Sequence, residues 1–353
     1  MSLKITMIGV SGTGKSCYLY ATYFRMLEGI GGFNFSCKDY NQGLDLQDAW
    51  DMMLDEGVWP AGNAESANFD FTCFYRGKSI GDFEWLDYRG GILLEHEDKE
   101  NDNEVAQFLR RAETSDALLV CLPADRILSA RPGEDKKQGN QWRSMAARLQ
   151  QIVGGVVKRN PSAALIFLIT KSDMCKKPDD GRFCVETVKK SFQQYFYGTP
   201  EHVMIAVTRM LEKTKTEETG DAQETVKFEQ REKIVGTVEP YNVHLPILFP
   251  FYLHTVAAAQ EFEAKARSAR GEERDFSRRA SSERAKSWWG KFWTGQYSQY
   301  YDDRASDRAK IASNCEQKAR ELQGVADEIW NELNGRVDIY CRGECVANAS
   351  GVR

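Results

Sequence analysis

The chain has 353 residues, of which 42% are hydrophobic and 28% are charged, a composition that is typical of a globular protein and excludes a fibre or a wholly disordered chain. The formal net charge of −5 provides no overall attraction to nucleic acid, so we expect no nucleic-acid partner.

The cellular location is suggested by what the sequence lacks. The first residues have neither the cationic flank nor the cleavage site of a signal peptide, and the nine cysteines lie far apart. We therefore expect reduced thiols in a cytoplasmic protein. The most apolar stretch, residues 243–259, contains two histidines and two prolines, so it predicts a buried element rather than a membrane span.

The first predicted elements are a strand, a loop and a helix. An apolar run at residues 3–8 is followed by a glycine-rich turn and then by an apolar-periodic stretch at residues 17–27. Residues 69–75 and 80–86 each alternate between apolar and polar side chains on either side of a short turn. This pattern predicts an antiparallel hairpin.

Two later segments are apolar throughout, residues 117–122 and residues 163–169, with helical spacing at residues 142–157 between them. Such runs are typical of strands that are buried on both faces of a mostly parallel sheet. The alternation of strands with helices therefore predicts a doubly wound α/β domain over residues 1–255.

The polar stretches at residues 131–140, 176–182 and 211–233 are predicted to be solvated insertions, the last of them either a charged helix or a mobile loop. After residue 255 alanines and charges dominate, and small apolar residues recur with heptad-like spacing. Two helices with small-residue seams predict an antiparallel helical hairpin within residues 256–340. We expect residues 341–353 to form a flexible tail.

Residues 9–16, GVSGTGKS, match the phosphate-binding loop at every required position, between a predicted strand and a predicted helix. The glycines allow successive backbone N–H groups to form an anion nest, reinforced by the positive end of the helix. Lys15 would reach the β- and γ-phosphates, and the hydroxyl of Ser16 would bind Mg²⁺. The residues expected to contact the nucleotide here are Gly9, Ser11, Gly12, Thr13, Gly14, Lys15, Ser16 and Cys17.

The segment WLDYRG places Asp87 at the end of a predicted strand, with Gly90 three residues later. An aspartate at this position can hold the Mg²⁺ shell together with Ser16, and the N–H of the glycine can meet the γ-phosphate. Further on, the buried run 165–169 continues into Thr170, Lys171, Ser172 and Asp173.

A carboxylate at Asp173 can accept hydrogen bonds from both the ring N–H and the amino group of guanine, a pair that adenine does not offer. Lys171 would lay its aliphatic stem over the base. The alternative is an ordinary polar turn after a buried strand. In that case the phosphate-binding loop alone would not distinguish a GTPase from an ATPase or a kinase.

Through GVSGTGKS, DYRG and TKSD in this order, residues 3–255 resemble the small-GTPase-like P-loop proteins of the translation-factor-related (TRAFAC) class. Within that class the chain looks most like the bacterial double-GTPase-type families of conflict systems, through GVWP at residues 57–60 and PYNV at residues 240–243. The resemblance implies a Ras-like fold, GTP or GDP with Mg²⁺, and a role in bacterial defence. It also implies that residues 205–208 end the strand before a loop that contacts the guanine.

Two departures from this class bear on catalysis. Gly91 occupies the place of the glutamine that orients the attacking water in Ras-type enzymes, and the first switch offers only Ser66 in place of a clear threonine. We therefore expect slow hydrolysis, with Lys15 and Arg89 as the catalytic residues, or with His96 or a partner residue supplying what is missing.

The predicted function is GTP binding and slow hydrolysis that switch partner binding or assembly. The alternatives are a nucleotide-dependent scaffold with negligible turnover and a P-loop ATPase or kinase. The aromatic run Trp288–Trp293, flanked by arginines and lysines, is either a plug that closes the hairpin against the GTPase domain or a contact for a protein partner or a second copy. A membrane contact is the less favoured alternative.

Overall fold

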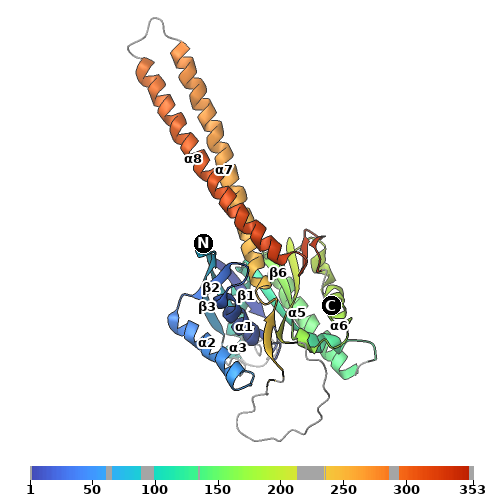
Figure 1. The fold of residues 1–353 in the computed structure, drawn as a ribbon. Coiled ribbons are helices and arrows are strands. Elements are labelled where there is room, and N and C mark those ends of the chain that lie inside the picture. Colours follow the sequence, from blue (N-terminus) through green and yellow to red (C-terminus); the bar gives the residue numbers. More distant parts are fainter. Residues whose placement is uncertain are drawn as a thin grey trace. The chain divides into compact units, whose positions relative to one another are not determined.

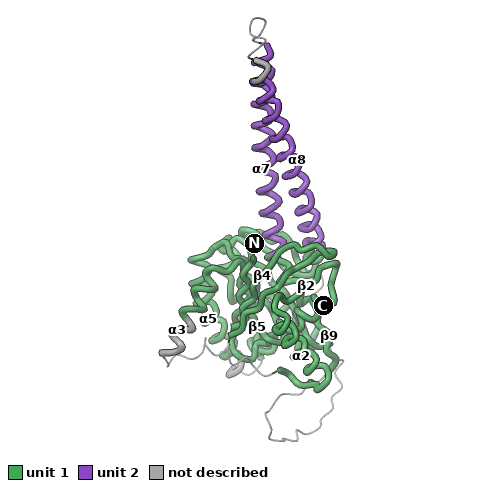
Figure 2. Tube along the Cα trace, turned by 90° about the vertical axis from the view of Figure 1, so that its left-hand side faces the viewer, with its two compact units in different colours: residues 1–250, 332–353 green, residues 251–331 purple. Residues whose placement is uncertain are grey.

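The computed structural model describes residues 2–60, 66–88, 99–133, 136–212, 234, 236–285 and 294–349 (Figure 1). The chain divides into two compact units, Met1–Pro250 together with Glu332–Arg353, and Phe251–Asn331 (Figure 2). The first unit holds the sheet, and the described residues of the second are all helical.

The first unit is built around one sheet with the strand order β11-β10-β7-β6-β5-β1-β4-β3-β2. The strands are β1 Ser2–Ile8, β2 Phe33–Cys37, β3 Ala67–Tyr75, β4 Lys78–Asp87, β5 Ala117–Pro123, β6 Ala164–Thr170, β7 His202–Val207, β10 Asp338–Cys341 and β11 Glu344–Ala347. The five central strands, from β7 to β4, run parallel, and antiparallel strands flank them at both edges. This confirms an α/β fold with a large, mostly parallel sheet. A separate antiparallel pair is formed by β8 Arg209–Leu211 and β9 Val238–Tyr241.

Helices cover both faces of this sheet. The helices of the first unit are α1 Lys15–Glu28, α2 Tyr40–Asp55, α3 Lys99–Glu113, α4 Ala124–Leu128, α5 Lys136–Arg159 and α6 Asp180–Ser191, with short 3₁₀ turns η1 Ser172–Met174 and η2 Gln193–Phe196. On one face α3, α5 and α6 share a buried core with β5 and β6, and Leu86 of β4 packs against it. The preceding residue, Trp85, points to the opposite face of the sheet, where its ring centroid lies 5.7 Å from that of Tyr18 in α1.

The predicted helical hairpin is confirmed as α7 Leu245–Ala285 and α8 Thr294–Leu333. Ala305, Ala312, Ala319 and Ala326 are buried at intervals of seven residues along α8. The ion pairs Arg270–Glu316 and Arg284–Asp302 show that the helices are antiparallel, because the partner's number falls as the first rises. Within the described residues no helix is long and apolar enough to cross a membrane.

The predicted boundaries of the helical elements need three corrections. The hairpin's first helix begins at Leu245 rather than after residue 255, because the apolar segment that follows is buried and Pro246 is tolerated in a first helical turn. The predicted insertions at 131–140 and 176–182 contain the beginnings of α5 and α6. Asp180, which lies in the segment 176–182, is buried because it forms an ion pair with Arg131. Residues 213–233 of the third insertion and the Trp288–Trp293 run lie outside the described residues.

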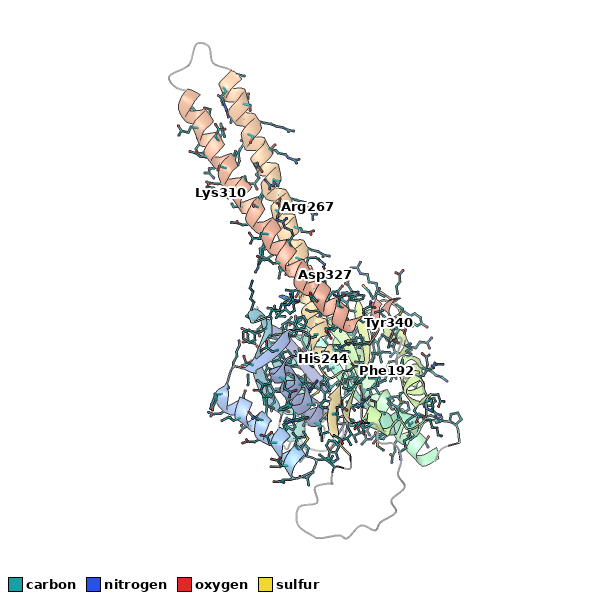
Figure 3. The ribbon with its side chains drawn as sticks, in the orientation of Figure 1. Phe192, His244, Arg267, Lys310, Asp327 and Tyr340 are labelled. Carbon is teal, nitrogen blue, oxygen red and sulfur yellow. The ribbon has the colours of Figure 1, made fainter. Side chains whose placement is uncertain are left out.

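Residues 341–347, which were expected to belong to a flexible tail, instead complete the sheet, and residues 350–353 lie outside the described residues. β10 pairs antiparallel with β7, and β11 pairs with β10 across a turn in which Arg342 and Gly343 both have positive φ, at 49° and 86°. Tyr340 packs against the core cluster that contains Phe192, both labelled in Figure 3. A two-residue turn and apolar inward-facing side chains therefore order residues 338–347.

Asp338 joins this hairpin to α6. Its carboxylate is buried, lies 2.9 Å from Nζ of Lys189 and accepts a hydrogen bond from the backbone N–H of Ala349. Burial alone would lower the pKa of Lys189, but its bonds to Asp338 and Tyr340 raise that pKa above its ordinary value. The lysine therefore stays charged and the ion pair persists at neutral pH.

Asp338→Ala should lower the free energy of unfolding by about 2–3 kcal/mol, because Lys189 and the N–H of Ala349 lose a buried charged acceptor. Glu344→Ala, an exposed carboxylate in β11, is the matched control and should change it by less than about 0.5 kcal/mol. Urea denaturation followed by circular dichroism measures both. Equal effects of the two substitutions would contradict the role given to Asp338.

Candidate functional site

The polar residues singled out in the sequence gather at one edge of the sheet. β4, β1, β5 and β6 are neighbours and run parallel, so their carboxyl ends lie side by side. The segments that leave this edge are the loop 9–14 after β1, Asp87 at the end of β4, α4 after β5, and residues 171–174 after β6. In open α/β sheets this edge is where ligands bind.

The loop after β1 is held in shape by two threonine hydroxyls. Oγ1 of Thr13, which is fully buried, donates to the carbonyl of Val10 at 2.9 Å, and Oγ1 of Thr170 donates to the carbonyl of Thr13 at 2.6 Å. Gly12 and Gly14 have φ of +75° and +82°, which other residues adopt only with strain. The loop carbonyls are thereby directed towards the protein.

The backbone donors of the same loop are left without protein partners. The N–H groups of residues 11–14 donate to no acceptor in the described part of the chain. α1 begins directly after them, and its N-cap residue is Gly14, which has no side chain that could cap the helix. Unused N–H groups at the amino terminus of a helix form a site for an anion, because the helix dipole adds to their partial positive charge.

Lys15 is buried beneath this loop, with only 7% of its surface exposed. Its Nζ donates to the carbonyls of Gly9 at 2.9 Å and Val10 at 3.2 Å. Burial lowers the pKa of Lys15, while Cys121 and Asp87 act in the opposite direction. A bound anion would add the negative charge that this buried ammonium group otherwise lacks at hydrogen-bond distance.

Ser16 and Asp87 bring two oxygen atoms together beside Lys15. Oγ of Ser16 donates to Oδ2 of Asp87 at 3.0 Å, and the carboxylate is 1% exposed. Burial raises the pKa of Asp87 to about 6, against the opposing effects of Lys15 and of the Ser16 hydrogen bond. A hydroxyl and a carboxylate are hard oxygen ligands, which suit Mg²⁺. Within the described residues no group of three or more histidine, cysteine or acidic side chains could hold a metal ion.

The loop after β6 lies against the loop after β7. The N–H of Ser172 donates to the carbonyl of Thr208 at 3.2 Å, and the N–H of Thr208 donates to that of Ile169 at 2.8 Å. Burial raises the pKa of the Asp173 carboxyl, while the nearby backbone of Met210 acts in the opposite direction. Asp173 therefore lies near the junction of the two loops.

Lys171 connects this pair of loops to the rest of the site. It has a left-handed backbone, with φ of 55°, and its Nζ lies 3.5 Å from Oδ2 of Asp125 in α4. It is also close enough to Cys17 of α1 to counteract part of the effect of burial, which raises the pKa of that thiol to about 12. The predicted residues Cys17, Thr170, Lys171 and Asp173 thus belong to one neighbourhood with the loop after β1.

The structure does not place every predicted site residue. Arg89, Gly90, Gly91 and His96 lie outside the described residues. It also adds two residues that the sequence patterns did not indicate, Asp125 and Arg126 at the start of α4. Nη2 of Arg126 donates to the carbonyl of Ser11 at 3.2 Å. The available signal was their position immediately after an apolar strand, at the edge where the phosphate-binding loop was expected.

No protein-family model matches the chain, and no curated protein matches it either. The function is therefore inferred from the residues of the site.

Gly9→Ala should destabilise the loop. A Cβ at Gly9 would lie 2.7 Å from Oγ1 of Thr13 and 3.2 Å from the carbonyl oxygen of Cys121, so we expect a loss of about 1–3 kcal/mol in the free energy of unfolding. The control is Gly155→Ala in α5, where a Cβ would meet nothing within 4 Å and helix propensity should give a gain of about 0.5–1 kcal/mol. Chemical denaturation measures both. An unchanged free energy of unfolding in Gly9→Ala would show that the loop can accommodate the added Cβ.

The burial of Asp87 predicts a pH dependence in the ligand-free protein. Because the pKa of Asp87 is raised to about 6, the folded state holds this proton more tightly than the unfolded state. Its contribution therefore makes the free energy of unfolding fall as pH rises between about 4 and 6, by about 3 kcal/mol in total.

Asp87→Asn removes this titration. The free energy of unfolding of the variant minus that of the wild type should therefore increase from pH 4.5 to pH 7 and stay level above it. Urea denaturation across this range measures the difference, with the exposed Asp48→Asn in α2 as the control. Profiles of the Asp87→Asn variant and the wild type that run parallel would contradict the assignment.

Proposed function

We propose that the chain is a Ras-like P-loop protein that binds GTP, hydrolyses it slowly and uses the nucleotide state to control assembly or partner binding. The observation that carries this proposal is the loop after β1, where unused N–H groups at an uncapped helix terminus lie above the buried ammonium group of Lys15. Loop and lysine together offer the donors that a chain of phosphates requires.

Ser16 and Asp87 are the residues that would hold Mg²⁺ in this site. Their contact at 3.0 Å supports the pairing, and two protein oxygens suffice where a nucleotide supplies phosphate oxygens as further ligands. The ion, when bound, would neutralise part of the charge on the β- and γ-phosphates. Gly90 would contact the γ-phosphate, as the sequence pattern predicts.

Guanine is the base that Asp173 favours. Its carboxylate lies near the junction of two loops on the same sheet edge as the phosphate loop, and Nζ of the neighbouring Lys171 lies 3.5 Å from Oδ2 of Asp125. A carboxylate that accepts two N–H bonds from one ring selects guanine over adenine. A P-loop ATPase or kinase remains the second candidate for the case in which Asp173 only braces its turn.

Two hydrogen bonds support a switch. The hydroxyls of Tyr18 and Thr22 in α1 donate to the carbonyl of Val243 at 2.8 and 3.1 Å, just before α7 begins. α1 starts at the phosphate loop, so a displacement at the nucleotide would act on the segment that leads into the helical hairpin. Because Gly91 replaces the water-orienting glutamine, we propose slow turnover; a scaffold that binds GTP without useful hydrolysis is the limiting case.

The cysteines and the order of the motifs support the location and the wider family. All nine cysteines are free, which supports a reducing, cytoplasmic location. The motif order supports membership of the TRAFAC class and the likeness to double-GTPase-type families of bacterial conflict systems. The partner is an unidentified protein or a second copy of the chain, bound through the hairpin.

Nucleotide binding tests this proposal directly. The wild type should bind GTP and GDP in preference to ATP, and Lys15→Ala should abolish binding of all of them. Isothermal titration, together with analysis of the base in any nucleotide that co-purifies, measures both. Equal affinity for ATP and GTP would overturn the guanine assignment, and unchanged binding by Lys15→Ala would overturn the phosphate site.

Asp173→Asn should weaken GTP binding by about 1.5–3 kcal/mol and favour xanthosine triphosphate, because an amide offers one acceptor and one donor in place of two charged acceptors. Asp179→Asn, an exposed aspartate six residues away, is the matched control and should leave both affinities unchanged. Competition with a fluorescent guanine nucleotide measures the change. Identical base preference in the two variants would show that Asp173 only shapes its turn.

A further inference from the structure

Arg126 reaches the phosphate-binding loop from the neighbouring strand. β5 pairs in parallel with β1, with Ile5–Ile8 beside Ala117–Val120, so the first turn of α4 begins next to the loop that follows β1. Arg126 lies in this turn, and Nη2 donates to the carbonyl of Ser11 at 3.2 Å. The same nitrogen is 3.7 Å from the position that a Cβ of Gly12 would take.

The guanidinium of Arg126 is poorly satisfied by the protein. Among the described residues its hydrogen-bond partners are the carbonyl of Ser11 and Sδ of Met145, a weak acceptor at 3.5 Å, and it forms no ion pair with any carboxylate there. By contrast, Arg131 is held by the carboxylates of Asp179 and Asp180. Arg126 therefore keeps both its charge and several N–H donors for a ligand at the loop.

A guanidinium group with free N–H donors can stabilise the charge that develops during phosphoryl transfer. In hydrolysis of GTP the oxygen of water bonds to the γ-phosphorus, the bond from that phosphorus to the β–γ bridging oxygen breaks, GDP leaves with the electron pair, and the water proton passes to the phosphate product. Negative charge shifts and spreads during this step, and an arginine that donates to it accelerates the reaction. With Gly91 at the position of the glutamine that orients the water, the rate would depend more strongly on stabilisation of this charge.

We propose that Arg126 is a catalytic residue which donates from within the chain to the terminal phosphate of bound GTP and stabilises the charge of the transferring group. This inference rests on the proposed GTPase function and goes beyond it by naming the residue on which the rate depends. Met145 and the carbonyl of Ser11 hold the guanidinium beside the phosphate loop before the nucleotide arrives.

Single-turnover hydrolysis with pre-bound GTP separates this role from binding. Arg126→Ala should lower the rate constant by about 30-fold or more, while the dissociation constants for GTP and GDP change by less than about fivefold. Arg126→Lys keeps the charge but not the planar fork, so it should restore only part of the rate. The matched control is Arg143→Ala on the exposed surface of α5, which should hydrolyse GTP at the wild-type rate.

Two further readouts distinguish catalysis from loop support. Guanidinium ion at low millimolar concentration should raise the rate of Arg126→Ala and leave that of Arg143→Ala unchanged, because it fills the place of the missing side chain. GDP with aluminium fluoride, which mimics the transferring phosphoryl group, should bind Arg126→Ala at least about tenfold more weakly than the wild type, although GDP alone binds equally.

The outcomes are separable from those of the proposed function. If the wild type binds GTP and Arg126→Ala hydrolyses it at the wild-type rate, the inference fails and the GTP-binding function stands. The inference also fails if Arg126→Ala weakens GTP and GDP equally with no effect on the bound rate, or if the wild type binds GTP and hydrolyses none. Failure of the wild type to bind any guanine nucleotide removes the proposed function and the inference together.

Discussion

The parallel pairing of β4, β1, β5 and β6 is the constraint on which the site depends. Parallel neighbours end at the same edge, so four segments that are far apart in the sequence are brought together without any long loop. Helices on both faces leave this edge as the part of the sheet where polar groups can face a ligand. The packing of the apolar core thereby decides where the charged residues meet.

The charges that meet there are held at some electrostatic cost. Lys15 and Asp87 are both buried, and burial acts against the charged form of each. The threonine hydroxyls and the loop carbonyls stabilise the backbone around them but add no negative charge. An anion on the loop side would offset the cost of burying the charge of Lys15, and a cation beside Asp87 would offset the cost of burying its carboxylate.

The sequence predicted the elements whose signal is local and strong. The apolar runs became β5 and β6, the glycine motif lies between β1 and α1, and the alanine heptads form the hairpin. The strands β10 and β11 were missed because each has four residues, although Arg342–Gly343 repeats the Arg76–Gly77 turn between β3 and β4. Arg126 was missed for another reason. It lies beside the phosphate-binding loop because β5 pairs with β1, and no local sequence pattern predicts that pairing.

The late position of β10 in the chain has a consequence for protein synthesis. β7 ends at Val207, whereas its partner β10 begins at Asp338, with the whole hairpin between them. At the usual pace of translation the outer edge of β7 emerges roughly ten seconds before the strand that covers it. Open strand edges invite pairing with other chains. A premature stop in codons 338–341 would remove all or part of β10 and would therefore leave that edge of β7 exposed for the lifetime of the protein, which favours aggregation.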